Sequence, residues 1–302
     1  MKSFTKDAPL REAPRTELRL LPLRLVLKSE TLTLDFFSGP LWRSGFGLAL
    51  KKHFPVVFDL LFADQASLGR LYSLRPPTRS VRTGECFELG LNLFGAATDH
   101  AIACAQALAR LGEMGLGERR GTYKLINAYV EGADVPFFDA SSGLVAWPGA
   151  LSSARWLEKS TKDVNVARVD LLTPLRIKDN NATCFGPPEF SQIVRRILGR
   201  LAQLCEAADE ASPLSQELAK SQIRLADNVS LQHCSEFRRE QVTRRSSRSQ
   251  QTMDFAGITG SLFFRGDLAP FAGLLALGEI TQLGGKTAFG FGRIHTRFSF
   301  ED

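Results

Sequence analysis

The sequence predicts an α+β protein in which one order of elements occurs twice, and three observations lead to this prediction. Strands and helices can be assigned in the order β-α-β-β-α-β in each half of the 302 residues. Hydrophobic residues make up 44% of the chain, enough for a sizeable core, and the length favours about two domains. No sequence repeat accompanies the two halves, so only the order of elements is duplicated. We place the domains at residues 1–150 and 163–302.

The first half is expected to begin and end with a strand. Apolar and basic residues alternate over residues 16–27, as in a half-buried strand. A Gly-Pro turn and apolar residues at helical spacing then predict a helix within residues 38–62. Two extended segments, a helix and a strand complete the half, at residues 67–77, 85–95, 99–115 and 121–130. Asp99 is expected to cap the start of that helix and Gly115 to end it.

The second half repeats this order around an insertion. A strand at residues 166–178 precedes a helix at 188–208, which has Pro188 near its start. Residues 212–241 look helical and polar, so we expect an arginine-rich helical insertion over about 205–248. Two strands, a helix and a final alternating strand follow, at residues 242–250, 257–266, 268–284 and 287–300. Each half therefore predicts a ferredoxin-like domain.

The charge of the chain suggests an anionic polymer as partner. The formal net charge is +6 and the isoelectric point is near 9.2. Arginine, which carries most of the excess, binds phosphate through two parallel donors in a way that lysine does not. Solubility alone is the competing explanation for a moderate excess of this size.

Cysteine usage and apolar runs indicate the compartment. The five cysteines are an odd number without a C-x-x-C pair, so neither a disulfide framework nor a metal site is expected. The first residues lack the apolar core of a signal peptide, and no apolar run reaches the roughly 18 residues of a membrane span. We therefore expect a cytoplasmic protein with no membrane partner.

A glycine-rich loop, LGGKTAFGFGRI, begins at Leu283 near the end of the chain. Its Gly-Lys-Thr resembles the end of a nucleotide-binding P-loop, but Ile280 stands where a P-loop needs its first glycine. With no downstream magnesium-holding motif either, a nucleotide-dependent enzyme is disfavoured. Lys286 and Arg293 supply positive charge, while Phe289 and Phe291 are expected either to pack inward or to stack on a base. Four glycines would let a phosphodiester approach backbone N–H groups, at Gly284, Gly285, Gly290 and Gly292.

Three stretches together resemble a known family. GDLAPFAGLLALGEITQLGGKTAFGFGRI is similar to the last helix, loop and strand of the RAMP superfamily, and RRSSRSQQTMDFAGITG resembles the basic segment before them. LNLFGAATDHAIACAQALARLGEMGLGERRGTYKL resembles the helix and strand of the first domain of that family. The chain thus resembles a CRISPR precursor-crRNA processing endoribonuclease of this superfamily.

The resemblance implies a function. It implies a metal-independent endoribonuclease without cofactors that cleaves CRISPR repeat hairpins by 2'-hydroxyl attack, leaving a 2',3'-cyclic phosphate and a 5'-hydroxyl. It also implies that the enzyme keeps the mature crRNA and joins other Cas effector subunits. We favour a type III or type IV system, because the arginine-rich segment and the small number of histidines would suit the latter. The alternative is a non-catalytic crRNA-binding RAMP subunit of an effector complex.

Two sets of residues are candidates for catalysis. The family commonly uses a histidine near its first helix, where this chain has His53. The other three histidines have structural explanations, as a cap neighbour, a residue of the insertion and a residue of the last strand. Arginines serve in family members without a suitable histidine, and the candidates here are Arg19, Arg24 and Arg43. A guanidinium is a poor base but can stabilise a pentavalent phosphate, and phosphate binding without catalysis is the alternative role.

The remaining candidates bind RNA. Lys51 and Lys52 lie beside His53. Arginines and neutral serine donors are concentrated in EFRREQVTRRSSRSQ, where a solvated surface is the alternative explanation. The arginines of this segment are Arg238, Arg239, Arg244, Arg245 and Arg248. We expect the preceding helical insertion to lie along the hairpin stem.

Overall fold

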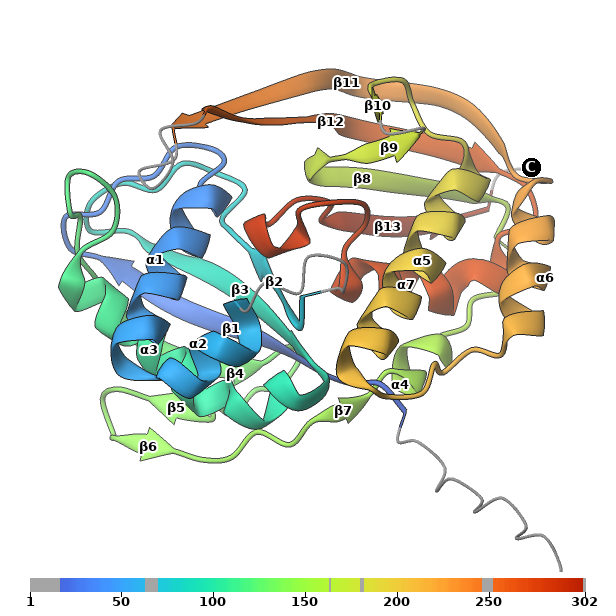
Figure 1. Cartoon of the computed structure of the whole chain (residues 1–302). Helices are drawn as coiled ribbons and strands as arrows, with labels where there is room; N and C mark the ends of the chain where they lie inside the picture. The colour runs from blue at the N-terminus through green and yellow to red at the C-terminus, as the bar shows by residue number, and fades with distance from the viewer. Residues whose placement is uncertain (1–16, 63–69, 163, 180–181, 246–251, 301–302) are drawn as a thin grey trace, which may run out of the picture.

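The computed structural model describes residues 17–62, 70–162, 164–179, 182–245 and 252–300. Two large antiparallel sheets, one in each half of the chain, lie side by side with helices packed against them, and the second half also has a two-stranded sheet (Figure 1). No described helix has the length and apolar character needed to cross a membrane.

The first domain is built on the strand order β2-β3-β1-β4, in which every pair is antiparallel. Leu23 and Leu25 of β1 are fully buried, whereas Arg24 between them points to the other face, as strand alternation requires. The elements are β1 (Arg19–Ser29), α1 (Gly39–His53), α2 (Pro55–Phe62), β2 (Tyr72–Arg75), β3 (Cys86–Phe94), the 3-10 turn η1 (Gly95–His100), α3 (Ala101–Met114) and β4 (Tyr123–Val130). Three short strands extend the sheet, β5 (Phe138–Asp139), β6 (Leu144–Val145) and β7 (Leu151–Ser152).

The ends of α3 test the two capping predictions. Gly115 ends the helix with a φ of 80°, as predicted, because a residue with a Cβ is strained there. The predicted cap by Asp99 is wrong: η1 precedes α3, and the N-cap position is His100. The Asp99 carboxylate instead accepts from the Arg19 guanidinium at 3.1 Å.

The second domain has the equivalent strand order, β11-β12-β8-β13. Its elements are α4 (Ala154–Leu157), β8 (Val166–Leu175), β9 (Ile177–Asp179), β10 (Ala182–Cys184), α5 (Phe190–Ala208), α6 (Gln216–Ala226), β11 (Ser230–Arg245), β12 (Thr252–Arg265), the 3-10 turn η2 (Ala269–Phe271), α7 (Ala272–Thr281), the 3-10 turn η3 (Thr287–Phe289) and β13 (Ile294–Ser299). The α+β class and the tandem ferredoxin-like arrangement are confirmed.

The predicted helical insertion is largely wrong, because α6 is the only new helix among its described residues and β11 follows at Ser230. Leu231, Cys234 and Phe237 pack against the second core at a spacing of three, which is typical of a helix. Here the spacing arises from two register shifts of β11 against β12, one of them accompanied by a φ of 51° at Glu236. Bulges in a long strand thus gave a helical pattern.

The last predicted strand also begins later than expected. Residues 287–300 were predicted to be extended, but Thr287–Phe289 form η3 and β13 begins at Ile294. Gly290 and Gly292 between them have φ values of 81° and 71°, which lie outside the strand region.

The two domains share buried contacts. Leu277 and Ile280 of α7 belong to the hydrophobic cluster of the first domain, as do Leu201 and Leu204 of α5. Between the predicted limits 1–150 and 163–302, β7 pairs with β1 and α4 packs against α7. This segment therefore contacts both domains, and the limits themselves stay a prediction.

Candidate nucleic-acid interface

The glycine-rich loop, residues 283–293, lies where the second domain meets the first. Just before it, the Gln282 side-chain amide donates to the carbonyl oxygen of Leu74 in β2 at 2.8 Å. The Asn92 amide of β3 donates to the carbonyl oxygen of Ile280 at 2.7 Å. Because both side chains are fully buried, these two bonds fix the start of the loop on the first domain.

The glycines of this loop are needed mainly for its own packing. A Cβ on Gly292 would lie 1.8 Å from the carbonyl oxygen of Leu283, and one on Gly290 would lie 2.4 Å from the ring of Pro76. A Cβ on Gly284 would lie 2.3 Å from a backbone oxygen. Gly285 differs, since it is exposed and its nearest neighbour would be 4.0 Å away. Of the four predicted glycines, only Gly285 therefore leaves space for a ligand.

The start of α1 contacts the other side of the loop. Arg43 stacks over the ring of Phe289, with its guanidinium carbon 4.4 Å from the ring centre, and lies 5.2 Å from the ring of Phe62. Phe37, just before the helix, packs edge-on against Phe291 at 5.0 Å between ring centres. A Cβ on Gly39 would lie 1.8 Å from the carbonyl oxygen of Phe289, so only glycine permits this approach.

Arg43 is thereby held in a fixed orientation. Aromatic rings on a guanidinium face restrict its rotation and leave its edge free to donate. Its Nε is buried and lacks a hydrogen-bond partner within the described residues. Burial raises the pKa of the adjacent Tyr72 to about 12, while the charges of Arg43 and Arg70 act against that increase. The phenol is therefore neutral at physiological pH.

The arginine set predicted around Arg24 and Arg43 is not assembled. Arg24 lies on the face of β1 opposite the buried leucines, where it pairs with Glu88 at 2.9 Å and stacks on Tyr129 at 4.3 Å. Helix α1 packs against the buried face, so the sheet separates Arg24 from Arg43.

Arg19 joins the two domains instead of lying beside Arg43. Its Nε donates to the Glu210 carboxylate at 2.7 Å, just after the end of α5, and its Nη1 donates to Asp99. The hydrogen bond from Arg19 to Glu210 raises the pKa of the guanidinium, and burial acts in the opposite direction. Arg19 already has two carboxylate partners.

His53 lies far from the loop. It is the last residue of α1 and is exposed, together with Lys51 and Lys52. At 1.5 Å of rise per residue, ten residues along the helix separate it from Arg43 by about 15 Å. The structure therefore places His53 and its lysines at one end of α1 and Arg43 at the other.

The other histidines have contacts of their own. His233 stacks on Phe263 at 4.1 Å, and His295 Nδ1 lies 3.5 Å from Glu279. His100 is half-buried at the junction of η1 and α3.

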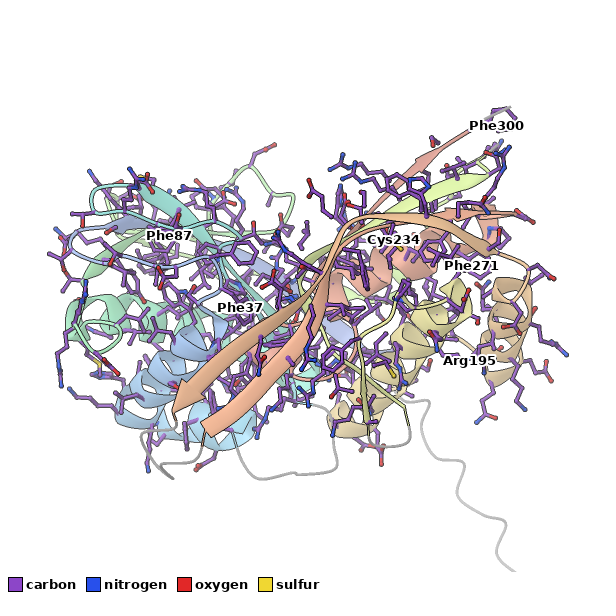
Figure 2. The ribbon with its side chains drawn as sticks, turned by 90° about the horizontal axis from the view of Figure 1, so that it is seen from above. Phe37, Phe87, Arg195, Cys234, Phe271 and Phe300 are labelled. Carbon is purple, nitrogen blue, oxygen red and sulfur yellow. The ribbon has the colours of Figure 1, made fainter. Side chains whose placement is uncertain are left out.

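The basic hairpin, formed by β11 and β12, extends from the second domain toward α1 of the first (Figures 1 and 2). Arg238 donates to Glu240 at 2.7 Å, while Arg239 lies 3.8 Å above the ring of Phe185. Both arginines are exposed. Arg244 and Arg245 pair through their backbones with Met253 and Thr252 near the end of the hairpin, and Arg248 lies outside the described residues.

The two cations of the glycine-rich loop have different environments. Lys286 has a φ of 66°, and its Nζ lies 5.4 Å from the Phe289 ring. Arg293 is half-buried, and burial lowers its pKa, with a further decrease from the charge of Arg75.

Sequence reasoning missed the contacts that organise this interface. Phe289 was expected to pack inward or to meet a base, not to hold Arg43, and Gln282 and Asn92 were not singled out. A polar residue in an otherwise apolar segment, as at Asn92 within ELGLNLF, is the one sequence signal that indicates such a buried bond.

Comparison with protein families gives two matches. Residues 169–294 match the family model of the CRISPR-associated endoribonuclease Cas6, and residues 63–145 match a model described as an N-terminal domain. No curated protein matches the chain.

Solved structures match over nearly the whole chain. A Cas6 product complex is 18% identical, with 92% of this chain and 99% of that chain covered and a TM-score of 0.62. A Thermus thermophilus Cas6 is 15% identical with the same coverage and a TM-score of 0.59. A partial Cas6-RT-Cas1–Cas2 complex is 13% identical with a TM-score of 0.61, and the match covers 94% of this chain and 47% of that one. The predicted resemblance to a CRISPR precursor-crRNA processing endoribonuclease of the RAMP superfamily is therefore confirmed, by the family match over residues 169–294 and by the similarity of fold over 92% of the chain.

Proposed function

We propose that this protein is a metal-independent endoribonuclease that cleaves CRISPR repeat hairpins in precursor crRNA and keeps the product bound. The observation that carries the proposal is Arg43, which is oriented by Phe289 at the junction of the two domains. The match of residues 169–294 to the Cas6 endoribonuclease family supports the substrate class.

The reaction needs no external reagent. The 2'-hydroxyl oxygen attacks the adjacent phosphorus and loses its proton, while the bond from phosphorus to the 5'-oxygen breaks and that oxygen gains a proton. The products are a 2',3'-cyclic phosphate and a 5'-hydroxyl. Charge develops on the phosphorane oxygens, and the paired N–H donors of Arg43 would stabilise it.

The proposed catalytic role falls to Arg43 rather than to His53. With about 15 Å between them along α1, the two side chains would not act on the same phosphate in this arrangement. A guanidinium does not accept a proton near neutral pH, so the 2'-hydroxyl proton would pass to water or to the substrate.

The basic hairpin would hold the repeat stem. Arg238 and Arg239 are exposed on β11, and arginine binds RNA phosphates through counterion release and bidentate hydrogen bonds. Retention of the mature crRNA and assembly with other Cas effector subunits complete the proposal.

The geometry also favours a second candidate, a non-catalytic crRNA-binding subunit. Within the described residues, Arg43 lies against the rings of Phe62 and Phe289 and beside Tyr72, and His53 is about 15 Å away along α1. An interface with an oriented cation but no nearby proton acceptor would bind RNA without cutting it.

Cleavage of a labelled repeat hairpin in excess EDTA separates the two candidates. We expect the wild type to yield a cyclic phosphate, and a 2'-deoxy nucleotide at the cut site to abolish cleavage. Arg43→Ala should lower the rate about 100- to 1000-fold, as loss of a transition-state donor does. Arg43→Lys should rescue little, because lysine lacks the planar fork.

A substitution outside the proposed site serves as the control for loss of cleavage. Arg119→Ala, in an exposed turn of the first domain, should cleave like the wild type. Loss of activity in His53→Ala with normal activity in Arg43→Ala would transfer the catalytic role to the histidine. Tight binding of RNA by the wild type without any product would establish the non-catalytic subunit.

A further inference from the structure

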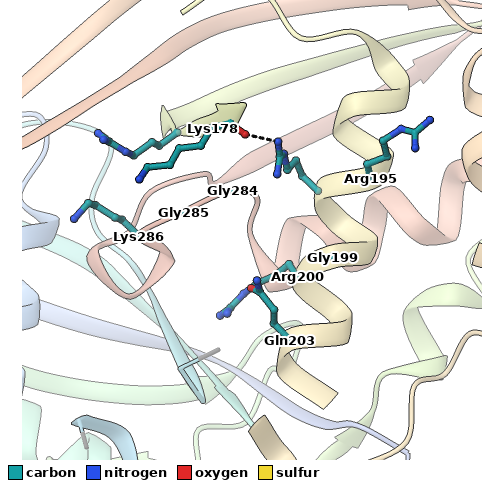
Figure 3. Close-up of a pocket in the computed structure, with 10 residues that line it drawn as sticks. Lys178, Arg195, Gly199, Arg200, Gln203, Gly284, Gly285 and Lys286 are labelled. Carbon is teal, nitrogen blue, oxygen red and sulfur yellow. Dashed lines mark hydrogen bonds between the residues drawn. The ribbon is translucent and has the colours of Figure 1, made fainter. Parts of the chain in front are cut away.

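A second cationic surface lies on the side of the glycine-rich loop that faces α5. A cavity of about 380 Å³ opens between α5, the β8–β9 segment and the loop (Figure 3). Six basic residues border this cationic pocket, and none of the described residues that line it is acidic. The basic residues are Arg176, Lys178, Arg195, Arg196, Arg200 and Lys286.

Arg200 is the least expected member of this pocket. Its side chain is only 6% exposed, and its guanidinium donates to the backbone oxygens of Thr281 at 3.4 Å and Arg70 at 3.3 Å. No carboxylate forms an ion pair with it within the described residues. Burial lowers its pKa to about 10, so it stays charged at neutral pH. A buried charge without a counter-ion costs stability, which a bound anion would offset.

The neighbouring cations are also held by backbone oxygens rather than by acids. Arg196 donates to the carbonyl oxygen of Lys178 at 2.6 Å, and Arg176 donates to that of Ala256 at 3.2 Å. The Nε of Arg176 is buried and has no hydrogen-bond partner within the described residues. Arg195 is the exception, since it points away from the pocket toward Asp227, 3.9 Å away (Figure 3).

A glycine keeps the pocket open on the helix side. Gly199 lies inside α5, where glycine is about 1 kcal/mol less favourable than alanine. A Cβ there would have no neighbour within 4 Å, so packing does not require glycine. A larger side chain at this position would enter the pocket.

We propose that the cationic pocket binds a phosphate group. The volume exceeds that of one phosphate, so the group would belong to a larger molecule, either an RNA strand or a small phosphorylated compound. Lys286 favours RNA, because it lines the pocket while its Nζ lies near Phe289, the ring that holds Arg43. The RNA source rests on the proposed function; the phosphate site does not.

Thermal unfolding in inorganic pyrophosphate, at constant ionic strength, tests the site directly. A ligand that binds only the folded protein raises its Tm, so pyrophosphate should stabilise the wild type relative to chloride. Gly199→Glu places an acid in the pocket and should abolish this increase in Tm. Arg200→Met removes the buried charge while nearly keeping the volume, and should also abolish the increase in Tm that pyrophosphate causes.

Two control variants test whether the increase in Tm depends on the pocket itself rather than on the overall charge of the protein. Gly199→Ala and Lys220→Glu, the latter exposed on α6 outside the pocket, should both retain the pyrophosphate shift. The proposal is overturned if pyrophosphate raises the Tm of the wild type no more than that of Gly199→Glu.

RNA binding distinguishes the two sources of phosphate. If RNA occupies the pocket, Gly199→Glu should weaken repeat-RNA binding at least tenfold and make its salt dependence shallower. Unchanged RNA affinity, together with a pyrophosphate shift that Gly199→Glu abolishes, would assign the pocket to a small phosphorylated compound. Neither measurement uses cleavage, so an inactive wild type would refute the proposed function and leave this test intact.

Discussion

The guanidinium carbon of Arg43 lies 4.4 Å from the centre of the Phe289 ring, and this contact joins α1 of one domain to the glycine-rich loop of the other. The loop carries Lys286 and Gly285 on its opposite side, toward α5. One short segment thereby positions an arginine on one side and lines a cationic pocket on the other. The loop is the structural link between the two proposed phosphate contacts.

Replacement of Phe289 by leucine should reduce cleavage without abolishing it. A cation–π contact contributes about 1 kcal/mol, which corresponds to roughly a fivefold change in rate. Because Phe289 would position Arg43 rather than touch the scissile phosphate, kcat should fall while RNA affinity changes little. Phe289→Tyr keeps the ring and should restore the rate, and equal rates for Phe289→Leu and the wild type would contradict this role.

Gln282→Met should destabilise the protein and loosen the loop. The substitution leaves the buried carbonyl oxygen of Leu74 without its donor, at a cost of about 1–3 kcal/mol. Denaturant unfolding would measure the loss. Gln216→Met, at an exposed position of α6, should change the free energy of unfolding by less than about 0.5 kcal/mol, and a similar loss in both variants would refute the explanation.

Two glycines of the same loop should respond differently to alanine. Gly292 has a φ of 71°, and a Cβ there would lie 1.8 Å from the Leu283 oxygen, so Gly292→Ala should cost about 1–3 kcal/mol or more. Gly285→Ala, with no atom closer than 4.0 Å to the added Cβ, should be tolerated within about 0.5 kcal/mol. Equal unfolding midpoints for the two variants would show that the loop can move to accommodate Gly292→Ala.

The order of helices and strands could be predicted from the sequence more fully than the contacts of the candidate nucleic-acid interface. Local alternation and helical spacing are properties of neighbouring residues, so both β-α-β-β-α-β halves were assigned correctly. The same rule failed for Leu231, Cys234 and Phe237, because bulges give a strand the spacing of a helix. A register shift depends on how a strand pairs with its partner strand, so the spacing of apolar residues along the strand itself does not reveal it.

The site depends on contacts between distant segments, which spacing does not reveal. The glycine-rich loop was identified from its composition, but the contact between Arg43 and Phe289 joins the two domains. The grouping of Arg24 with Arg43 failed for a similar reason. Alternation places Arg24 on the face of β1 opposite the buried leucines, but only the assembled fold shows that α1 covers the buried face.

Acid unfolding should depend on Asp170, a buried carboxylate of β8. Burial pushes the pKa of Asp170 upward, but the hydrogen bond from Ser261 and those from Arg168, with the charge of Arg297, outweigh it and hold the pKa below its ordinary value. A carboxyl whose folded pKa is depressed adds stability that is present above its unfolded pKa, near 3.9, and is lost as the pH falls through the folded value.

We therefore expect the stability of the wild type to decrease more steeply below about pH 4 than that of Asp170→Asn, which has no proton to gain there. At neutral pH the variant should be the less stable of the two, because Arg168 and Arg297 lose the carboxylate that joins β8 to β13. Denaturant midpoints between about pH 2 and pH 7 would measure both effects. Asp134→Asn, in an exposed turn of the first domain, should follow the wild-type curve. If Asp170→Asn also followed that curve, the acid dependence would lie with other carboxylates, and the Ser261–Asp170–Arg297 contacts would not contribute to it.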